Sequence, residues 1–176
     1  MDEKIIKLSE DNFRRYLDEG KIKKINKVEQ IIYETYLRNA KESLNVANHL
    51  FQNKTSSLWV VVTSYYSMFY MAQAYLYKLG YKTNEGNVHK VVNESLIAKC
   101  RNKIKDYLLE NYSDEKEKAL IIVDNYLDNY GREKAKRSSF QYETTEKIKE
   151  SKAKTSLERA KEFLTLIEEI LLKNQL

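Results

Sequence analysis

The sequence predicts an all-α protein, an up-and-down bundle of four or five main helices. The chain of 176 residues contains no proline and only four glycines, whereas turn-dense β-sandwiches and proline-rich linkers need many of both. Apolar residues recur every three or four positions along most of the chain, which is the period of an amphipathic helix. The length corresponds to one domain with a sizeable core. We expect residues 26–176 to form this bundle and residues 1–25 to form a short N-terminal helical appendage.

Glycines and capping residues divide the first half of the chain into three predicted helices. Residues 2–20 predict a short polar helix. A long amphipathic helix follows over residues 26–52, and Thr55 or Ser56 is placed to cap the next helix. That third helix extends to Gly80, because glycine is typical just beyond a helix C-terminus.

The second half of the chain contains further helical segments. Thr83 or Asn84 is predicted to cap one of them, and a shorter helix covers residues 102–111. Ser113 has the position of another cap, which predicts that a new helix starts there. Gly131 interrupts or bends that helix.

The helix that ends at Gly80 has the length of a membrane span, since residues 58–77 carry no charged side chain. Five tyrosines are spread through these residues, whereas tyrosines in membrane spans gather at the two interfaces. We therefore predict a fully buried central helix, with a membrane helix as the alternative. One side of it forms an aromatic stripe that we assign to a homodimer interface, because aromatic residues are enriched in interface cores. The predicted interface residues are Trp59, Tyr66, Tyr70 and Tyr77.

Composition excludes several classes of function. Lys and Arg outnumber Asp and Glu by 31 to 26, a mildly basic balance that is compatible with acidic partners. One cysteine and two histidines cannot supply an internal disulfide or a Cys/His zinc site, so we expect no metal or other cofactor and a reducing, cytoplasmic compartment. The motifs of common hydrolases and nucleotide triphosphatases, such as a Gly-rich phosphate loop, are also absent from the sequence.

The most basic part of the chain is residues 132–154, which contain eight Lys or Arg and four Glu. Guanidinium groups match the geometry of phosphate oxygens. The alternative is an exposed helix surface whose charges are paired with Glu133 and Glu143. We assign nucleic-acid binding to the first part of this segment, with the candidate residues Arg132, Lys134, Lys136, Arg137 and Gln141. From Ser151 onward, apolar residues return at helical spacing and predict the last helix of the bundle.

Three stretches of the chain share the pattern of one known family. They are the segment SLWVVVTSYYSMFYMAQAYLYKLGYKT, the sequence VHKVV that opens the following helix at residues 88–92, and the final helix SLERAKEFLTLIEEIL. With the first long helix, they make residues 26–172 resemble a HEPN domain. The resemblance implies a helical bundle that pairs as a homodimer, with a polar motif near the dimer cleft.

The resemblance also implies a chemistry. Many HEPN proteins are metal-independent ribonucleases, often toxins of toxin–antitoxin or defence systems, and are often encoded beside a small nucleotidyltransferase. In these members an Arg binds phosphate, and a His after four to six intervening residues acts on the ribose 2′-hydroxyl. The matching Arg here is Arg137, and Tyr142 stands at the first position where the His is expected. Because a phenol is a poor base at neutral pH, we expect RNA or nucleotide binding without efficient cleavage.

Two other functions fit the same residues. One is an active ribonuclease toxin that uses Arg137 and Tyr142 as catalytic residues. The other is a non-catalytic interaction protein, an adaptor partnered with a nucleotidyltransferase. We interpret His49 and His89 as ordinary surface or boundary histidines, not as replacements for the missing catalytic His.

Overall fold

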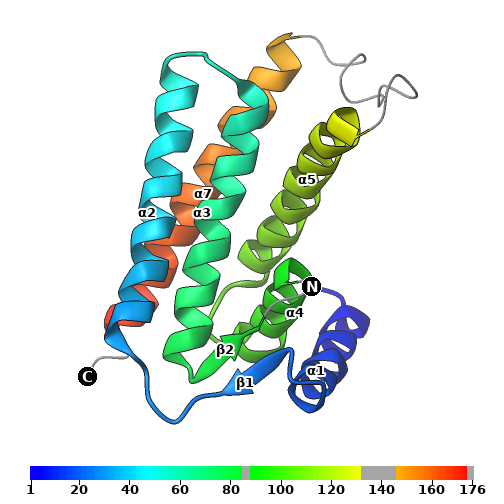
Figure 1. Cartoon of the computed structure of the whole chain (residues 1–176), viewed down its shortest axis with the longest axis vertical. Helices are drawn as coiled ribbons and strands as arrows, with labels where there is room; N and C mark the ends of the chain where they lie inside the picture. Colours follow the sequence, from blue (N-terminus) through cyan, green and yellow to red (C-terminus); the bar gives the residue numbers. More distant parts are fainter. Residues whose placement is uncertain (85–87, 132–145, 174–176) are drawn as a thin grey trace.

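The computed structural model describes residues 1–84, 88–131 and 146–173, while the side chains of residues 125–131 and 146–148 lie outside this description. Within that part of the chain there are six helices and one two-stranded sheet, so the all-α helical bundle is confirmed and the sheet is an addition to it. Four long helices run alongside one another (Figure 1). They are α2 (Gln30–Gln52), α3 (Ser57–Lys78), α5 (Asp106–Gly131) and α7 (Glu146–Lys173). Two shorter helices, α1 (Glu3–Asp18) and α4 (Val88–Cys100), pack together at one end.

The central helix is α3, which contacts α2, α7, α5 and α4. Fourteen of its 22 residues are buried, because its apolar side chains lie on all sides and each needs cover from water. Its N-terminus is capped as predicted, since the Ser56 hydroxyl accepts the backbone N–H of Trp59 at 3.3 Å. The prediction of a buried central helix is therefore confirmed. No helix in the described ranges combines the length and the apolar character that crossing a membrane requires.

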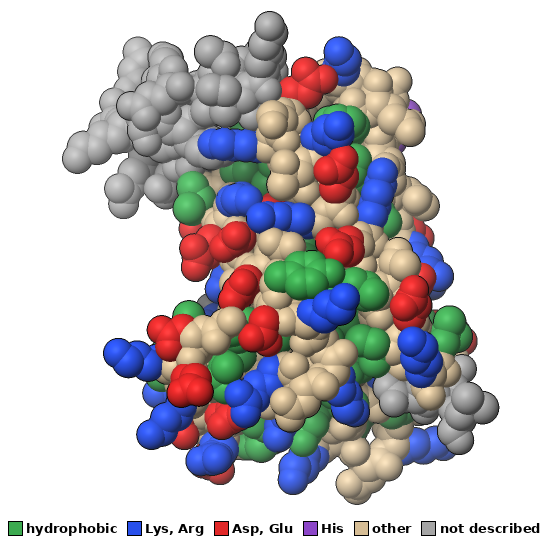
Figure 2. Space-filling view, turned by 180° about the vertical axis from the view of Figure 1, so that it is seen from behind, with side chains coloured by type: hydrophobic (Ala, Val, Ile, Leu, Met, Phe, Trp, Pro, Cys, Tyr) green, Lys and Arg blue, Asp and Glu red, His purple; other side chains and the backbone are tan. Residues whose placement is uncertain are grey.

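The outer helices are amphipathic and turn their charged sides to solvent. Seen from behind, Lys and Arg side chains lie interspersed with Asp and Glu (Figure 2). Exposed ion pairs link neighbouring parts of the bundle, among them Lys41 with Glu168 at 3.1 Å and Lys54 with Glu150 at 3.7 Å. Such exposed pairs stabilise a fold by about 0–1 kcal/mol each. The bundle is therefore held together mainly by its apolar core.

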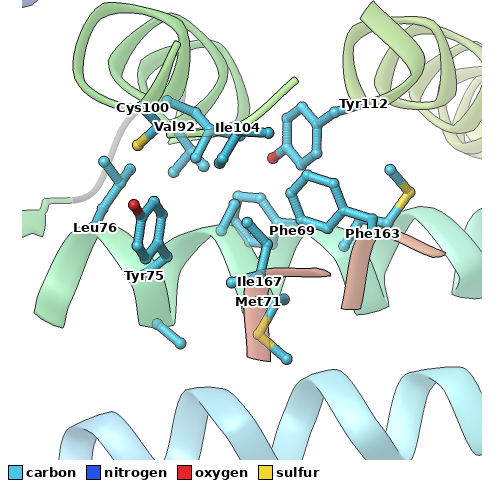
Figure 3. Packing of buried hydrophobic residues seen from close by; sticks show 14 of the residues in the cluster. Phe69, Met71, Tyr75, Leu76, Val92, Cys100, Ile104, Tyr112, Phe163 and Ile167 are labelled. Carbon is cyan, nitrogen blue, oxygen red and sulfur yellow. The ribbon is translucent and has the colours of Figure 1, made fainter. Parts of the chain in front are cut away.

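The core joins α3 to the helices on either side of it (Figure 3). Tyr112 of α5 and Phe163 of α7 pack with ring centroids 5.5 Å apart, and both side chains are fully buried. Further along α3, Tyr75 lies near the α4 residues Val92 and Cys100 (Figure 3). Burying a large apolar side chain stabilises the fold by about 1.5–3 kcal/mol, so these layers fix the positions of α4, α5 and α7 around α3.

A small antiparallel sheet, which the sequence analysis did not predict, pairs β1 (Ile22–Lys24) with β2 (Tyr81–Thr83). Each strand follows a helix that ends at a glycine with positive φ, Gly20 at 68° and Gly80 at 88°. That backbone conformation strains residues with a Cβ, so glycine allows the chain to leave the helix and turn into the strand. Strands of three residues are too short to show a period in the sequence.

The N-terminal helix α1 packs on α4 and on β1. Glu94 of α4 accepts hydrogen bonds from the Tyr16 hydroxyl at 2.5 Å and from the Asn12 amide at 3.0 Å. Phe13 packs edge-on against Tyr81, with the ring centroids 5.2 Å apart. Residues 3–18 are thus attached to the bundle through α4 and the sheet.

The helix α5 is continuous, and this corrects one prediction. A short helix over residues 102–111 and a second helix capped by Ser113 were expected, but α5 runs without interruption from Asp106 to Gly131. Inside this helix the Ser113 hydroxyl lies 3.0 Å from the Leu109 carbonyl and 2.9 Å from Asn93 Oδ1, so its single hydrogen has two acceptors within reach. A serine can satisfy its hydroxyl in this way without ending a helix. Tyr112 and Glu115 on either side are fully buried, so tertiary packing keeps this stretch helical.

A buried carboxylate ties α5 to α7. Glu115 is 0% exposed and accepts hydrogen bonds from the Ser156 hydroxyl at 2.5 Å and from Arg159 at 2.9 Å, both on α7. Lys118, one turn along α5, donates to the same carboxylate at 2.8 Å. A charged group that is buried away from water is tolerated only when it is paired and hydrogen-bonded, as the Glu115 carboxylate is. These bonds fix the position of α5 relative to α7. Residues 132–145 join these two helices along the chain.

Neutralising this carboxylate should weaken the fold. We expect Glu115→Gln to lower the free energy of unfolding by about 2–3 kcal/mol, because Lys118 loses its charged partner and Arg159 keeps only Asp114, at 3.6 Å. Urea denaturation monitored by circular dichroism measures this change. The matched control is Glu158→Gln on α7, whose side chain is 64% exposed, and it should change stability by less than about 0.5 kcal/mol. Equal effects of the two substitutions would refute the structural role of Glu115.

Candidate functional site

The predicted nucleic-acid residues lie outside the described part of the chain. They are Arg132, Lys134, Lys136, Arg137 and Gln141, and the same holds for Tyr142. The helices on either side of them are described. The end of α5 at Gly131 and the start of α7 at Glu146 lie at the end of the bundle where α2 is joined to α3 (Figure 1). The described residues that flank residues 132–145 therefore lie at that end.

The predicted dimer interface is partly available on the surface of α3. Trp59 is 42% exposed, and Tyr66 and Tyr70 are partly buried, with ring centroids 6.2 Å apart. Tyr77 is only 1% exposed, so it cannot contribute to a surface that meets a partner. Its ring packs edge-on against Tyr36 of α2 at 5.9 Å. The helical spacing placed Tyr77 on the stripe, but the start of α2 covers that end of α3.

A group of polar side chains lies where α3, α4 and α5 meet, and we call it the His89 junction. It comprises Tyr65 from α3, His89 and Asn93 from α4, and Tyr112, Ser113 and Lys116 from α5. The Tyr65 hydroxyl lies 2.8 Å from His89 Nδ1. The imidazole ring packs on Phe69, with centroids 4.5 Å apart, and meets the edge of Tyr66 at 5.7 Å and 90°. His89 is thus held on one side by a buried hydroxyl and on its faces by aromatic rings.

The electrostatics of the junction favour a neutral imidazole. Burial lowers the pKa of His89 below its ordinary value, and the positive charge of Lys116 lowers it further. Burial raises the pKa of Tyr65, so that phenol stays protonated. The Tyr65 hydroxyl is fully buried and lies within hydrogen-bond distance of Nδ1. This hydrogen bond fixes the orientation of the His89 ring.

The other charges of the described surface do not form a basic patch on the face seen from behind. There, cationic and anionic side chains alternate over the described residues (Figure 2). Among the residues with described positions, no group of three or more His, Cys, Asp or Glu side chains comes together as a metal site would require. The candidate functional regions are therefore the α3 surface, the His89 junction and the end of the bundle where α5 ends and α7 begins.

The comparison with known families decides the classification. The model of the HEPN domain matches residues 33–170. The chain belongs to the HEPN family. No curated protein matches the sequence significantly. The matched residues extend from α2 to α7 and include the aromatic stripe, His89 and the basic segment. Membership indicates a function related to nucleotides or RNA.

The half-buried position of His89 agrees with its interpretation as a surface or boundary residue. Its bond to a buried tyrosine from another helix was not predicted. Tyr65 and His89 are 24 positions apart, and neither has a distinctive neighbour pattern of its own. The only signal in the sequence was that both belong to the stretches that carry the family resemblance.

Protonation of His89 should oppose folding. Since the pKa of His89 is lower in the folded state than its ordinary value of 6.5, the unfolded chain binds this proton more tightly. The contribution of His89 to stability is complete above about pH 6.5 and is lost as the pH falls through the lower pKa of the folded state. We expect urea denaturation to give a free energy of unfolding that decreases from about pH 7 to about pH 5, and less steeply in His89→Gln.

The matched control for this measurement is His49→Gln, because His49 is exposed on α2 and outside the junction. The same steepness in wild type and His89→Gln would show that folding does not perturb the imidazole.

Proposed function

We propose that this HEPN protein is a homodimer that binds RNA or a nucleotide through the basic segment around Arg132, Lys134, Lys136 and Arg137, without efficient RNA cleavage. The observation that carries the proposal is the family match, which spans this segment and the helices that flank it. The sequence of residues 132–145 supports it, with four Lys or Arg and two Glu. Binding to a phosphate backbone is dominated by such charges and weakens steeply with salt.

The proposal of weak or absent cleavage rests on the residue that replaces the family's histidine. Tyr142 stands five positions after Arg137, where catalytic members have an imidazole. An ordinary phenol has a pKa of about 10 and removes a proton from a ribose hydroxyl poorly at neutral pH. Arg137 keeps the guanidinium that contacts phosphate, so binding is retained where proton transfer is lost.

RNA affinity should depend on Arg137 and on salt. Fluorescence anisotropy with a labelled single-stranded RNA should show that Arg137→Ala weakens binding by about tenfold and reduces the slope of log affinity against log salt by about one. The matched control is Arg14→Ala, which removes the same charge from an exposed side chain on α1. Unchanged affinity in Arg137→Ala would overturn the assignment of this segment.

The same RNA should remain intact after incubation with the protein in the absence of metal. If expression of the wild type arrests growth and Tyr142→Phe relieves the arrest, the protein is instead a ribonuclease toxin. If it ignores RNA but co-purifies with a nucleotidyltransferase, it is instead an adaptor. The toxin–antitoxin setting and the cytoplasmic location remain proposals, and a buried free thiol at Cys100 is compatible with a reducing compartment.

Dimerisation is proposed to use the aromatic stripe on α3. Trp59, Tyr66 and Tyr70 present rings at helical spacing on a side of α3 that the protomer covers only in part. Large aromatic residues in such positions contribute strongly to protein interfaces. Two copies related by a two-fold axis would cover each other's stripes.

A charge in the stripe should separate the protomers. We expect Trp59→Glu to raise the dimer dissociation constant by about 30-fold or more, because a carboxylate would be buried without a partner. Size-exclusion chromatography with light scattering measures the mass as a function of concentration. The matched control is Ile31→Glu, at a side chain on α2 that is 74% exposed. A wild-type protein that is monomeric at all concentrations would contradict this proposal.

A further inference from the structure

A cavity of about 130 Å³ lies where the turn between α2 and α3 meets the first part of α7. Its lining residues are Leu50, Phe51, Lys54, Ser57, Val60 and Glu150. Val60 is 1% exposed and belongs to an apolar cluster against which Leu50 and Phe51 pack. Lys54 and Glu150 are exposed, and Lys54 Nζ lies 3.7 Å from a carboxylate oxygen of Glu150. The cavity therefore has an apolar part and an exposed side that carries one cation and one anion.

This cavity is at the end of the bundle to which the proposed function assigns RNA. Glu150 follows Glu146, the first residue of α7, by four positions. Four residues of an α-helix advance by about 6 Å. The turn between α2 and α3 lies at the same end of the bundle (Figure 1). The cavity is therefore about one helical turn from the residue at which α7 begins.

The backbone of Lys54 is unfavourable for a lysine. Its φ is 50°, and among the described residues other than glycine it is the one with a positive value. Lys54 follows the C-terminus of α2, a position that glycine occupies without a steric penalty because it has no Cβ. Strained backbone of this kind gathers at functional sites. Fold stability alone would favour glycine at position 54, so it does not account for the lysine.

The size of the cavity fits one six-membered aromatic ring. An apolar protein cavity of about 150 Å³ holds a benzene molecule, and the volume here is about 130 Å³. A pyrimidine base is a ring of this size, whereas the two fused rings of a purine need more space. Phe51 adds an aromatic side chain to the lining, and bases stack on such side chains in proteins that bind single strands.

The two charges at the exposed side discriminate between the pyrimidines. The Lys54 ammonium group only donates hydrogen bonds, and the Glu150 carboxylate only accepts them. Cytosine presents acceptor atoms and an exocyclic amino group that donates. Uracil carries a carbonyl oxygen in place of that amino group, and this oxygen offers no hydrogen to the carboxylate. The pair is therefore complementary to cytosine.

We propose that this cavity binds one cytosine base, with Phe51 beside the ring, Glu150 accepting a hydrogen bond from the amino group and Lys54 donating to the acceptor atoms of the same base. The cytosine belongs to an RNA strand or to a free nucleotide, which share this chemistry. The inference rests on the proposed function, because it specifies the base that is recognised at the end of the bundle where α7 begins.

Base preference is measured by fluorescence anisotropy with labelled oligo(C), oligo(U) and oligo(A) RNA of equal length. We expect oligo(C) to bind about tenfold more tightly than the other two, since one matched base edge gives discrimination of this order. Glu150→Gln should reduce the difference between oligo(C) and oligo(U) to less than about threefold, because an amide can donate to the uracil oxygen. The matched control is Glu158→Gln, which is exposed on the same helix and should keep the preference.

Replacing Lys54 separates binding from stability. Lys54→Gly removes the amine and relieves the backbone, so we expect the affinity for oligo(C) to fall about tenfold while the midpoint of urea denaturation stays the same or rises. A lysine that acts only by pairing with Glu150 to hold the helices together would give a lower midpoint and unchanged affinity. Lys23→Gln removes the same charge from an exposed position on β1, at the other end of the bundle, and should keep the preference for oligo(C) (Figure 1).

Competition with unlabelled mononucleotides distinguishes the two sources of the base. Displacement of oligo(C) by cytidine monophosphate but not by uridine monophosphate shows that a free nucleotide is sufficient. No displacement by either shows that a strand is required. Equal displacement by both overturns the cytosine site.

The remaining outcomes separate this site from the proposed function. Equal binding of the three oligomers, or a preference for oligo(C) that persists unchanged in Glu150→Gln or Lys54→Gly, overturns the cytosine site even if RNA binding depends on Arg137. A preference that depends on Glu150 and Lys54 but not on Arg137 supports this site and overturns the assignment of the basic segment. A protein that binds none of the oligomers and neither mononucleotide refutes both.

Discussion

The fold depends on the need to cover α3 on nearly every side. Apart from Lys78 at its last residue, this helix has no charged side chain, and its apolar residues do not form one stripe but surround the axis. Such a helix cannot lie at the surface, because too much apolar area would face water. The amphipathic helices α2, α5 and α7 cover it over most of its length, and α4 covers its C-terminal part. Among the described residues, the side of α3 that is left partly open is the aromatic stripe, so the constraint that builds the bundle also marks the surface proposed to meet a second copy.

Much of this architecture could be read from the sequence because it follows from periodicity and caps. The boundaries of α2 and α3 lie within a few residues of the prediction, and Ser56 and Gly80 perform the predicted capping and stopping roles. The prediction was wrong where a local signal competes with tertiary packing. Ser113 looks like a cap, but burial of Tyr112 and Glu115 keeps α5 helical through it. The sheet was missed because three paired residues have no period of their own, and their pairing is fixed by contacts between distant segments.

The candidate functional site could likewise be predicted from the sequence only in part. The family and the basic segment could be predicted from the sequence alone. The stretches around residues 58–84 and the clustered Lys and Arg are recognised without knowing the fold. The burial of Tyr77 and the bond between His89 and Tyr65 were not accessible, because each depends on how one helix crosses another. Helical spacing predicts which residues share a side of α3. It does not predict which part of that side is covered by α2 or α4.

The single cysteine gives the protein an internal reporter of its own motions. Cys100 is fully buried against α3 at the end of α4, and burial raises the pKa of its thiol. A thiol in this state reacts with alkylating reagents only during moments when α4 separates from the bundle, because only then does it meet solvent and ionise. The rate of labelling at Cys100 therefore records how often that layer opens. No residue has to be replaced to introduce the label, and the kinetics can be followed by intact mass.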